Sequence, residues 1–186
     1  MTLILDYDAG NLGSVKRACT EVGLAAEFSA DPAAVAQAER IIFPGVGAAG
    51  SAMRSLAERG LDVALKQAIA KGTPVLGICL GMQVSLDYSE ENDTKTLGLI
   101  AGRVQRFQLD HPDLKIPHMG WNEVRVRQSH PVLAPALPKY RQLFLYPAQR
   151  LRWQQALQPA SQQQLQPRSF RALRVAAFLY RYQHTT

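Results

Sequence analysis

Short apolar runs alternate with amphipathic segments through the first 110 residues. The apolar runs are typical of buried strands and fall at 2–7, 25–28, 40–45 and 74–78. Apolar positions at helical spacing predict helices at 12–22, 50–59, 61–71 and 80–88. Strands and helices in alternation are typical of a parallel sheet covered by helices. We therefore expect an α/β fold of three layers whose central sheet is mostly parallel.

Beyond about Gly102 the pattern changes. Residues 103–109 and 122–128 alternate apolar and polar side chains, as antiparallel strands with one solvent-facing side do. Residues 143–186 are rich in Gln and Arg and contain no Asp, Glu, Lys or Gly, although average chains are about 7% Gly and about 25% charged. We expect one domain over 1–142 and an atypical, poorly ordered Gln/Arg-rich tail over 143–186, for which an interaction segment is the simplest interpretation.

Charge and hydropathy narrow the class of protein. The net charge is +6, and the six arginines of the tail account for all of it, so residues 1–142 are balanced. A balanced domain argues against a nucleic-acid partner. No apolar run approaches the ~20 residues of a membrane helix, and no basic segment leads into a signal-type apolar stretch. We expect no membrane partner and a cytoplasmic location.

Only two cysteines occur, and their spacing is not that of metal ligands, so we expect no metal. Cys19 lies at helical spacing with apolar neighbours, which predicts a buried core residue. Cys79 stands at the centre of "GICLG" (77–81), between a predicted strand and a predicted helix. This is the cysteine form of a nucleophile elbow, where small residues permit a sharp turn. A buried structural cysteine is the alternative for this motif alone.

Two features of the predicted turns suit nucleophilic chemistry. The start of a helix favours a thiolate, and the N–H of Leu80 would point to where an oxyanion forms. A second glycine-rich turn, "FPGVGAAG" (43–50), lacks the Gly-Lys-Ser/Thr ending of a phosphate-binding loop. Turns at the carboxyl ends of neighbouring strands line the ligand crevice of open α/β sheets. Gly45, Val46 and Gly47 could therefore supply a second backbone donor opposite Cys79.

Five segments carry a family resemblance, in matching order and spacing: "DYDAGNLGSV" (6–15), "PGVGAAGSAM" (44–53), "LGICLGMQ" (76–83), "GLIAGRVQRF" (98–107) and "IPHMGWNEV" (116–124). Together they closely resemble the glutaminase subunits of imidazole glycerol phosphate synthase, which are class I glutamine amidotransferases of histidine biosynthesis. The resemblance covers about residues 1–140. It implies a class I amidotransferase-like, flavodoxin-like domain over 1–142.

The resemblance also implies roles for individual residues. Cys79 would attack the carboxamide of L-glutamine and form a glutamyl thioester. The N–H groups of Val46 and Leu80 would form the oxyanion hole, and Gln83 would help to hold the substrate. Ammonia would pass to a cyclase subunit in a heterodimer, giving the synthase its hydrolase and lyase activities. No cofactor is implied.

The family's catalytic base has no counterpart in this sequence. The family completes its triad with the His and Glu of a late "QFHPE" segment, which does not occur here. His111 and His130 precede Pro, but no Glu follows. His118 belongs to "PHMGWN", which is not the base segment, and His184 lacks a following acid. We expect turnover by this chain to be impaired.

The genetic code offers an account of this departure. Shifting the codons of "LFLYPAQRL" (143–151) by one nucleotide permits a stretch close to the family's missing strand. We hypothesise a frameshifted reading of an amidotransferase gene. Two other functions remain open at this point: a non-catalytic subunit that binds a partner through the retained "PHMGWN" motif, and a different cysteine hydrolase whose base is His184 or a partner residue.

Overall fold

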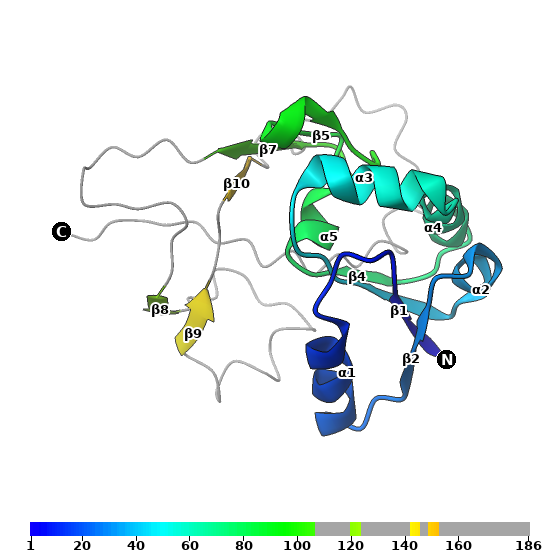
Figure 1. The fold of residues 1–186 in the computed structure, drawn as a ribbon. Coiled ribbons are helices and arrows are strands. Elements are labelled where there is room, and N and C mark those ends of the chain that lie inside the picture. Colours follow the sequence, from blue (N-terminus) through cyan, green and yellow to red (C-terminus); the bar gives the residue numbers. More distant parts are fainter. Residues whose placement is uncertain (107–119, 124–141, 146–148, 153–186) are drawn as a thin grey trace, which may run out of the picture. The chain divides into compact units, whose positions relative to one another are not determined.

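The computed structural model describes residues 1–106 and the strands at 120–123, 142–145 and 149–152. It divides into two compact units, of which the first contains Met1–Gln105 and the second Arg106–Arg150. The first unit holds a parallel sheet of four strands in the order β2-β1-β3-β4 (Figure 1). The strands are β1 (Thr2–Leu5), β2 (Ala26–Ser29), β3 (Arg40–Phe43) and β4 (Val75–Gly77).

The register of the sheet aligns the carboxyl ends of its strands. Ile4 of β1 lies beside Ile42 of β3, and Phe43 lies beside Gly77 of β4. The order is that of flavodoxin-like sheets, in which the winding reverses between β1 and β3. Such sheets bind ligands beyond the carboxyl ends of the strands at this point. The turns after β1, β3 and β4 are therefore the expected place for a site.

Helices cover both faces of this sheet, as expected from the sequence. They are α1 (Leu12–Glu21), α2 (Pro32–Gln37), α3 (Ala49–Glu58), α4 (Leu61–Ala70) and the short α5 (Leu80–Gln83). Figure 1 shows α1 on one side of the sheet and α3 and α4 on the other. Leu3 and Leu5 of β1 join the core that α2, α3 and α4 cover, whereas Ile4 joins a smaller core beneath α1. This alternation confirms a three-layer α/β domain.

Local sequence signals account for the ends of these helices. The Asn11 side chain accepts a hydrogen bond from the Ser14 N–H at 3.2 Å, which caps α1 as its sequence predicts. Gly23 follows α1 with a φ of 69°, a conformation that glycine adopts readily. The helix α2 was not predicted, because its six residues are too few for a periodic pattern. Asp31 caps it by accepting from the Ala33 N–H at 2.9 Å.

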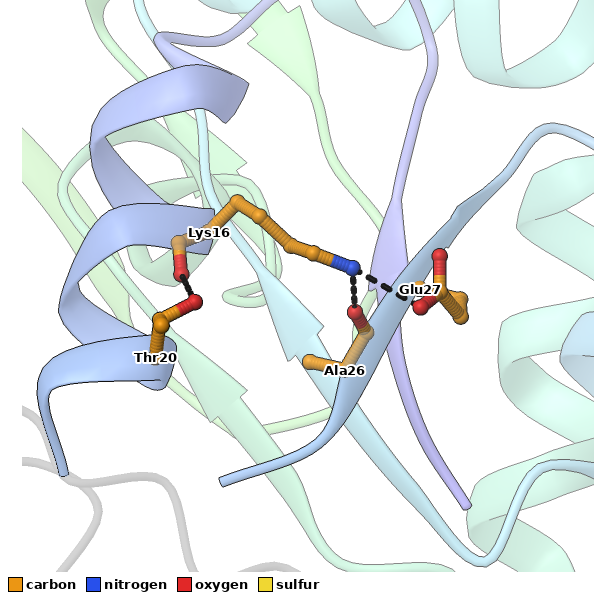
Figure 2. A network of polar contacts seen from close by, with 4 residues as sticks. All are labelled: Lys16, Thr20, Ala26 and Glu27. Carbon is orange, nitrogen blue, oxygen red and sulfur yellow. Dashed lines mark hydrogen bonds and ion pairs between the residues drawn. The ribbon is translucent and has the colours of Figure 1, made fainter. Parts of the chain in front are cut away.

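A lysine joins α1 to the edge strand β2. The Nζ atom of Lys16 donates to the Ala26 carbonyl and, at 2.9 Å, to the Glu27 carboxylate (Figure 2). The same Nζ lies 5.6 Å from the centre of the Phe28 ring. Thr20, one turn further along α1, donates to the Lys16 carbonyl. These contacts fix α1 against the outer strand of the sheet.

The helix expected over 80–88 is wrong beyond Gln83. After α5 the chain forms a hairpin of β5 (Tyr88–Ser89) and β6 (Thr94–Lys95), with the 3-10 helix η1 (Glu91–Asp93) between them. The Val84 carbonyl, which a helix reaching Tyr88 would use, accepts from the Leu97 N–H instead. The neighbouring Ser85 carbonyl accepts from the N–H groups of Leu99 and Ile100. Tertiary pairing therefore overrides the helical periodicity here.

The strands beyond residue 102 fit the sequence pattern only in part. The strand β7 (Arg103–Arg106) forms within the predicted 103–109 segment, in a second sheet of order β10-β7-β5-β6. It pairs with β5 in parallel, so the expected antiparallel arrangement is wrong at this contact.

Two further strands pair in the second unit. The strand β8 (Gly120–Glu123) pairs antiparallel with β9 (Gln142–Leu145), and β10 spans Gln149–Arg152. Most of the 122–128 prediction and of the 143–186 tail lies outside the described residues. The domain boundary at 142/143 stays a prediction.

Candidate functional site

Cys79 occupies a strained turn at the carboxyl end of β4. It joins β4 to α5 with a φ of 56° and a ψ of −116°. A positive φ is uncommon for any residue with a Cβ, and this ψ also lies outside the left-handed helical region. The side chain is exposed to solvent. The sequence prediction of Cys79 at a strand-to-helix turn is confirmed, and its strained backbone is that of a nucleophile elbow.

The glycines on either side of Cys79 leave no room for side chains. A Cβ on Gly81 would lie 1.9 Å from the Phe43 carbonyl oxygen, and a Cβ on Gly77 would lie 2.9 Å from the Met82 Cα. The backbone is held by hydrogen bonds from the Ile78 N–H to the Phe43 carbonyl at 2.9 Å and from the Gln83 N–H to the Cys79 carbonyl at 3.1 Å. The spacing of "GICLG" therefore allows the elbow to pack directly on the end of β3.

The predicted second turn touches the elbow at Gly45. A Cβ on Gly45 would lie 2.8 Å from the Gly81 nitrogen and 2.9 Å from the Leu80 Cβ. Both Gly45 and Leu80 are buried, whereas Val46 and Gly47 are exposed. The glycine turn and the cysteine turn thus meet at the carboxyl edge of the sheet, where the sequence analysis expected them.

The two predicted oxyanion donors differ in their hydrogen bonds. The Val46 N–H donates to the Ala9 carbonyl at 3.3 Å, in the turn after β1. Among the described residues none accepts from the N–H of Leu80, the first residue of α5. Within the described part of the chain, the Leu80 N–H is thus the one of the pair that can meet an oxyanion without first breaking a hydrogen bond. Gln83 is half-buried on α5, one turn beyond Cys79.

Tyr7 is a buried neighbour of the site that the sequence analysis did not single out. Its hydroxyl donates to the Pro44 carbonyl at 2.9 Å, and its ring packs edge-on against Phe43. Burial raises the pKa of Tyr7 above its ordinary range, and the charge of a Cys79 thiolate raises it further. Tyr7 stands in "DYDAGNLGSV" (6–15), one of the segments that carry the family resemblance, but neither the residue pattern nor the resemblance gave it a role.

The helix α3 holds the turn after β1 in place. Ser55 donates to the Tyr7 carbonyl at 2.5 Å, and Arg59, just past the end of α3, forms an ion pair with Asp8. At the other end of α3, the Glu91 carboxylate accepts from the Ala49 N–H at 2.8 Å, as a capping acid does. These contacts connect the turns after β1 and β3 through one helix.

The other residues considered from the sequence are the second cysteine, the histidines and possible metal ligands. Cys19 is 5% exposed in the core beneath α1, as predicted. The four histidines lie outside the described residues. Within the described ranges, no cluster of His, Cys, Asp or Glu is suited to a metal ion, and no helix has the length and apolar character needed to cross a membrane.

Comparison with known proteins agrees with this geometry. The family model "Glutamine amidotransferase class-I" matches residues 3–143. "Imidazole glycerol phosphate synthase subunit HisH" of Nitratidesulfovibrio vulgaris (strain DSM 19637 / Miyazaki F) is 45% identical over 156 residues, covering 80% of this chain and 74% of that protein. The HisH subunit of Symbiobacterium thermophilum is 51% identical over 134 residues, covering 71% of this chain and 61% of that protein.

A solved structure shares the fold. "Crystal structure of glutamine amidotransferase" superposes with a TM-score of 0.54 at 15% identity, and the match covers 65% of this chain and 62% of that chain. At this identity the likeness concerns the fold alone. Together with the family match over three quarters of the sequence, it leads to one conclusion: the chain belongs to the class I glutamine amidotransferases, among relatives named HisH.

Proposed function

We propose that Cys79 is the nucleophile of a glutaminase site, in a cytoplasmic subunit that supplies ammonia to the cyclase subunit of imidazole glycerol phosphate synthase. The observation that carries this proposal is the exposed Cys79 side chain on a strained elbow. A strained backbone persists only where the surrounding structure enforces it, and it is common at active sites. Relatives named as HisH subunits of imidazole glycerol phosphate synthase support a partner subunit. The match to the class I glutamine amidotransferase family supports L-glutamine as the substrate.

The chemistry starts with the Cys79 thiolate. Its sulfur attacks the carboxamide carbon of glutamine, and the carbonyl electron pair moves onto oxygen. The Leu80 N–H can donate a hydrogen bond to the oxyanion that forms. Collapse of this intermediate breaks the C–N bond, and the departing nitrogen takes up a proton to leave as ammonia. Water then hydrolyses the thioester to glutamate. Val46 would supply a second donor only after releasing the Ala9 carbonyl.

Both proton transfers need an acid–base group of the kind that the family's late "HPE" segment carries. Protonation of the leaving nitrogen and activation of water usually fall to a histidine held by an acid. The "HPE" segment of the family is absent from residues 143–186. Members of a catalytic triad act as a unit, so that losing one lowers kcat by several orders of magnitude. The proposed function therefore includes a binding-competent but turnover-impaired chain.

A second candidate is a non-catalytic subunit that only binds the partner. It is favoured by the retention of "PHMGWN" at 117–122 in a chain without the base segment. The two candidates differ in whether Cys79 serves catalysis once a base is supplied.

Glutamate release separates these candidates. The full chain, a chain with the reading frame shifted after Gln142 and its Cys79→Ser variant are each assayed with and without the cyclase. We expect no release by the full chain, and Cys79-dependent release by the frame-shifted chain when the cyclase is present. If the frame-shifted chain binds the cyclase but stays inactive, the non-catalytic subunit is the better account. Release by the full chain would mean that Cys79 uses a different base.

A further inference from the structure

We propose that Tyr7 is a positioning residue for Cys79. Its hydroxyl fixes the glycine turn at 44–47 against the elbow and so sets where a substrate carbonyl meets the thiolate. This inference rests on the proposed function, because it concerns the same cysteine. The proposal adds a residue of the turn after β1 to a site otherwise made of the turns after β3 and β4.

The hydroxyl of Tyr7 lies where the two turns meet. It donates to the Pro44 carbonyl at 2.9 Å and would lie 2.3 Å from a Cβ on Gly45. The same Cβ would be 2.8 Å from the Gly81 nitrogen. One small volume therefore holds the tyrosine oxygen, the backbone of the glycine turn and the backbone of the elbow. A displacement of any one of them must move the others, since close-packed interiors transmit such shifts.

The tyrosine ring is itself held from several sides. Tyr7 is 1% exposed, and its ring centre lies 5.4 Å from that of Phe43 at an angle of 65°. Ser55 on α3 donates to the Tyr7 carbonyl at 2.5 Å. Held in this way, the hydroxyl can act as a fixed point for the Pro44 peptide. A mobile side chain could not do so.

Removing only the hydroxyl oxygen would free the glycine turn. Pro44 is buried, so Tyr7→Phe leaves its carbonyl without the donor it has here. A buried unpaired carbonyl is unfavourable and draws its peptide toward another donor or water. The adjoining residues are Gly45 and Val46, which would move with it. Because Gly45 packs on the elbow, the change should reach the place where a substrate carbonyl is polarised.

If Tyr7 had only a structural role in the core, a different result would be expected. Removing its hydroxyl would lower the melting temperature, and it would change the rates at which Cys79 reacts with all reagents by the same factor. A positioning role should affect a reagent that needs its carbonyl aligned, and spare one that needs only an accessible thiolate. Two alkylating agents make this distinction.

The experiment compares the two agents on the full chain. One is the chloromethyl ketone analogue of L-glutamine, whose carbonyl must be aligned, and the other is iodoacetamide, a small reagent that reaches an exposed thiol. In each case the Cys79 sulfur forms a bond to the methylene carbon, and the halide leaves with its electron pair. Rates at Cys79 are measured by peptide mass spectrometry for the wild type, Tyr7→Phe and a control, Tyr88→Phe. The Tyr88 hydroxyl bonds to Asp93 outside the site.

We expect Tyr7→Phe to lower the chloromethyl ketone rate at least tenfold, since a misplacement of about 1 Å can cost about 100-fold in rate, while the iodoacetamide rate changes less than about twofold. Tyr88→Phe should change neither rate. Circular dichroism melts ensure that rates are compared on folded protein. If Tyr7→Phe does not fold, Ser55→Ala, which releases the Tyr7 backbone, should lower the same ratio of rates.

Two results would count against the inference, and they are distinguishable. Equal changes in both rates, or none, in the folded variant would overturn the positioning role and leave the proposed function intact. If the wild type reacts no faster with the L than with the D form of the chloromethyl ketone, the proposed glutamine site fails and the positioning role fails with it.

Discussion

The substitution Gly81→Ala tests whether the elbow depends on close backbone packing. The new Cβ would lie 1.9 Å from the Phe43 carbonyl oxygen and 2.8 Å from the carbonyl carbon. Real Cβ atoms hardly ever approach other heavy atoms within 3.0 Å. The elbow and the end of β3 would therefore have to separate by about 1 Å, a form of overpacking that typically costs about 1–3 kcal/mol.

These magnitudes predict two measurable losses. For a chain of this size, each kcal/mol lowers the melting temperature by about 2–4 °C, so Gly81→Ala should melt about 2–12 °C below the wild type. A shift of about 1 Å at the nucleophile should also slow labelling by the glutamine chloromethyl ketone by about 100-fold. Thermal melts followed by circular dichroism and the labelling rate at Cys79 give the two values.

Gly13→Ala is the matched control. Gly13 is the second residue of α1, and a Cβ there would meet nothing within 4 Å. Alanine is favoured over glycine in helices by up to about 1 kcal/mol, so this variant should melt at or above the wild-type temperature and keep its labelling rate. If Gly81→Ala behaved like Gly13→Ala in both assays, the elbow would not depend on this packing and the reasoning would be refuted.

Three further predictions follow from the described contacts. Iodoacetamide should modify exposed Cys79 much faster than Cys19, which is 5% exposed, and peptide mass spectrometry measures both rates; faster modification of Cys19 would contradict the burial described above. Because folding raises the pKa of Tyr7, the stability linked to its hydroxyl is fully present below the ordinary pKa of about 10 and is lost as pH rises beyond that value. Between about pH 8 and about pH 11 the melting temperature should therefore fall less for Tyr7→Phe than for the wild type. Equal falls in the two proteins would contradict the raised pKa. Asn11→Ala should destabilise the domain by about 0.5–2 kcal/mol in urea unfolding, because the Ser14 N–H loses its cap, and an unchanged midpoint would show that the cap contributes nothing.

Much of the first unit could be predicted from residue patterns. The strands β1, β3 and β4 are apolar runs, of which β3 stops before Pro44 and β4 ends at Gly77. The helix α1 begins at a capping Asn11. "GICLG" carried enough information to place Cys79 at a strand-to-helix turn, since only small neighbours fit that turn. Each of these features depends on residues that are close together in the sequence, so the residue pattern is enough to predict it.

The features that were missed depend on contacts between distant segments. The helix after Cys79 ends at Gln83, and residues 97–100 donate to the carbonyls of 84–86. No local pattern reveals this pairing. The Val46 N–H donates to the Ala9 carbonyl. The sequence "PGVG" does not determine this orientation of the peptide group. The hydroxyl of Tyr7 reaches Pro44 across 37 positions of sequence. Site details of this kind follow from the packing of the whole sheet.

Protection of Cys79 by L-glutamine tests the central claim most directly. The full chain is alkylated with iodoacetamide in the presence of L-glutamine or D-glutamine, and modification of Cys79 and Cys19 is followed by mass spectrometry. A glutamine site at the elbow predicts that L-glutamine slows the reaction at Cys79 in a saturable way, that D-glutamine does not, and that Cys19 is unaffected by either. Equal alkylation of Cys79 with L-glutamine, with D-glutamine and without either would contradict the claim that this cysteine serves a glutamine site.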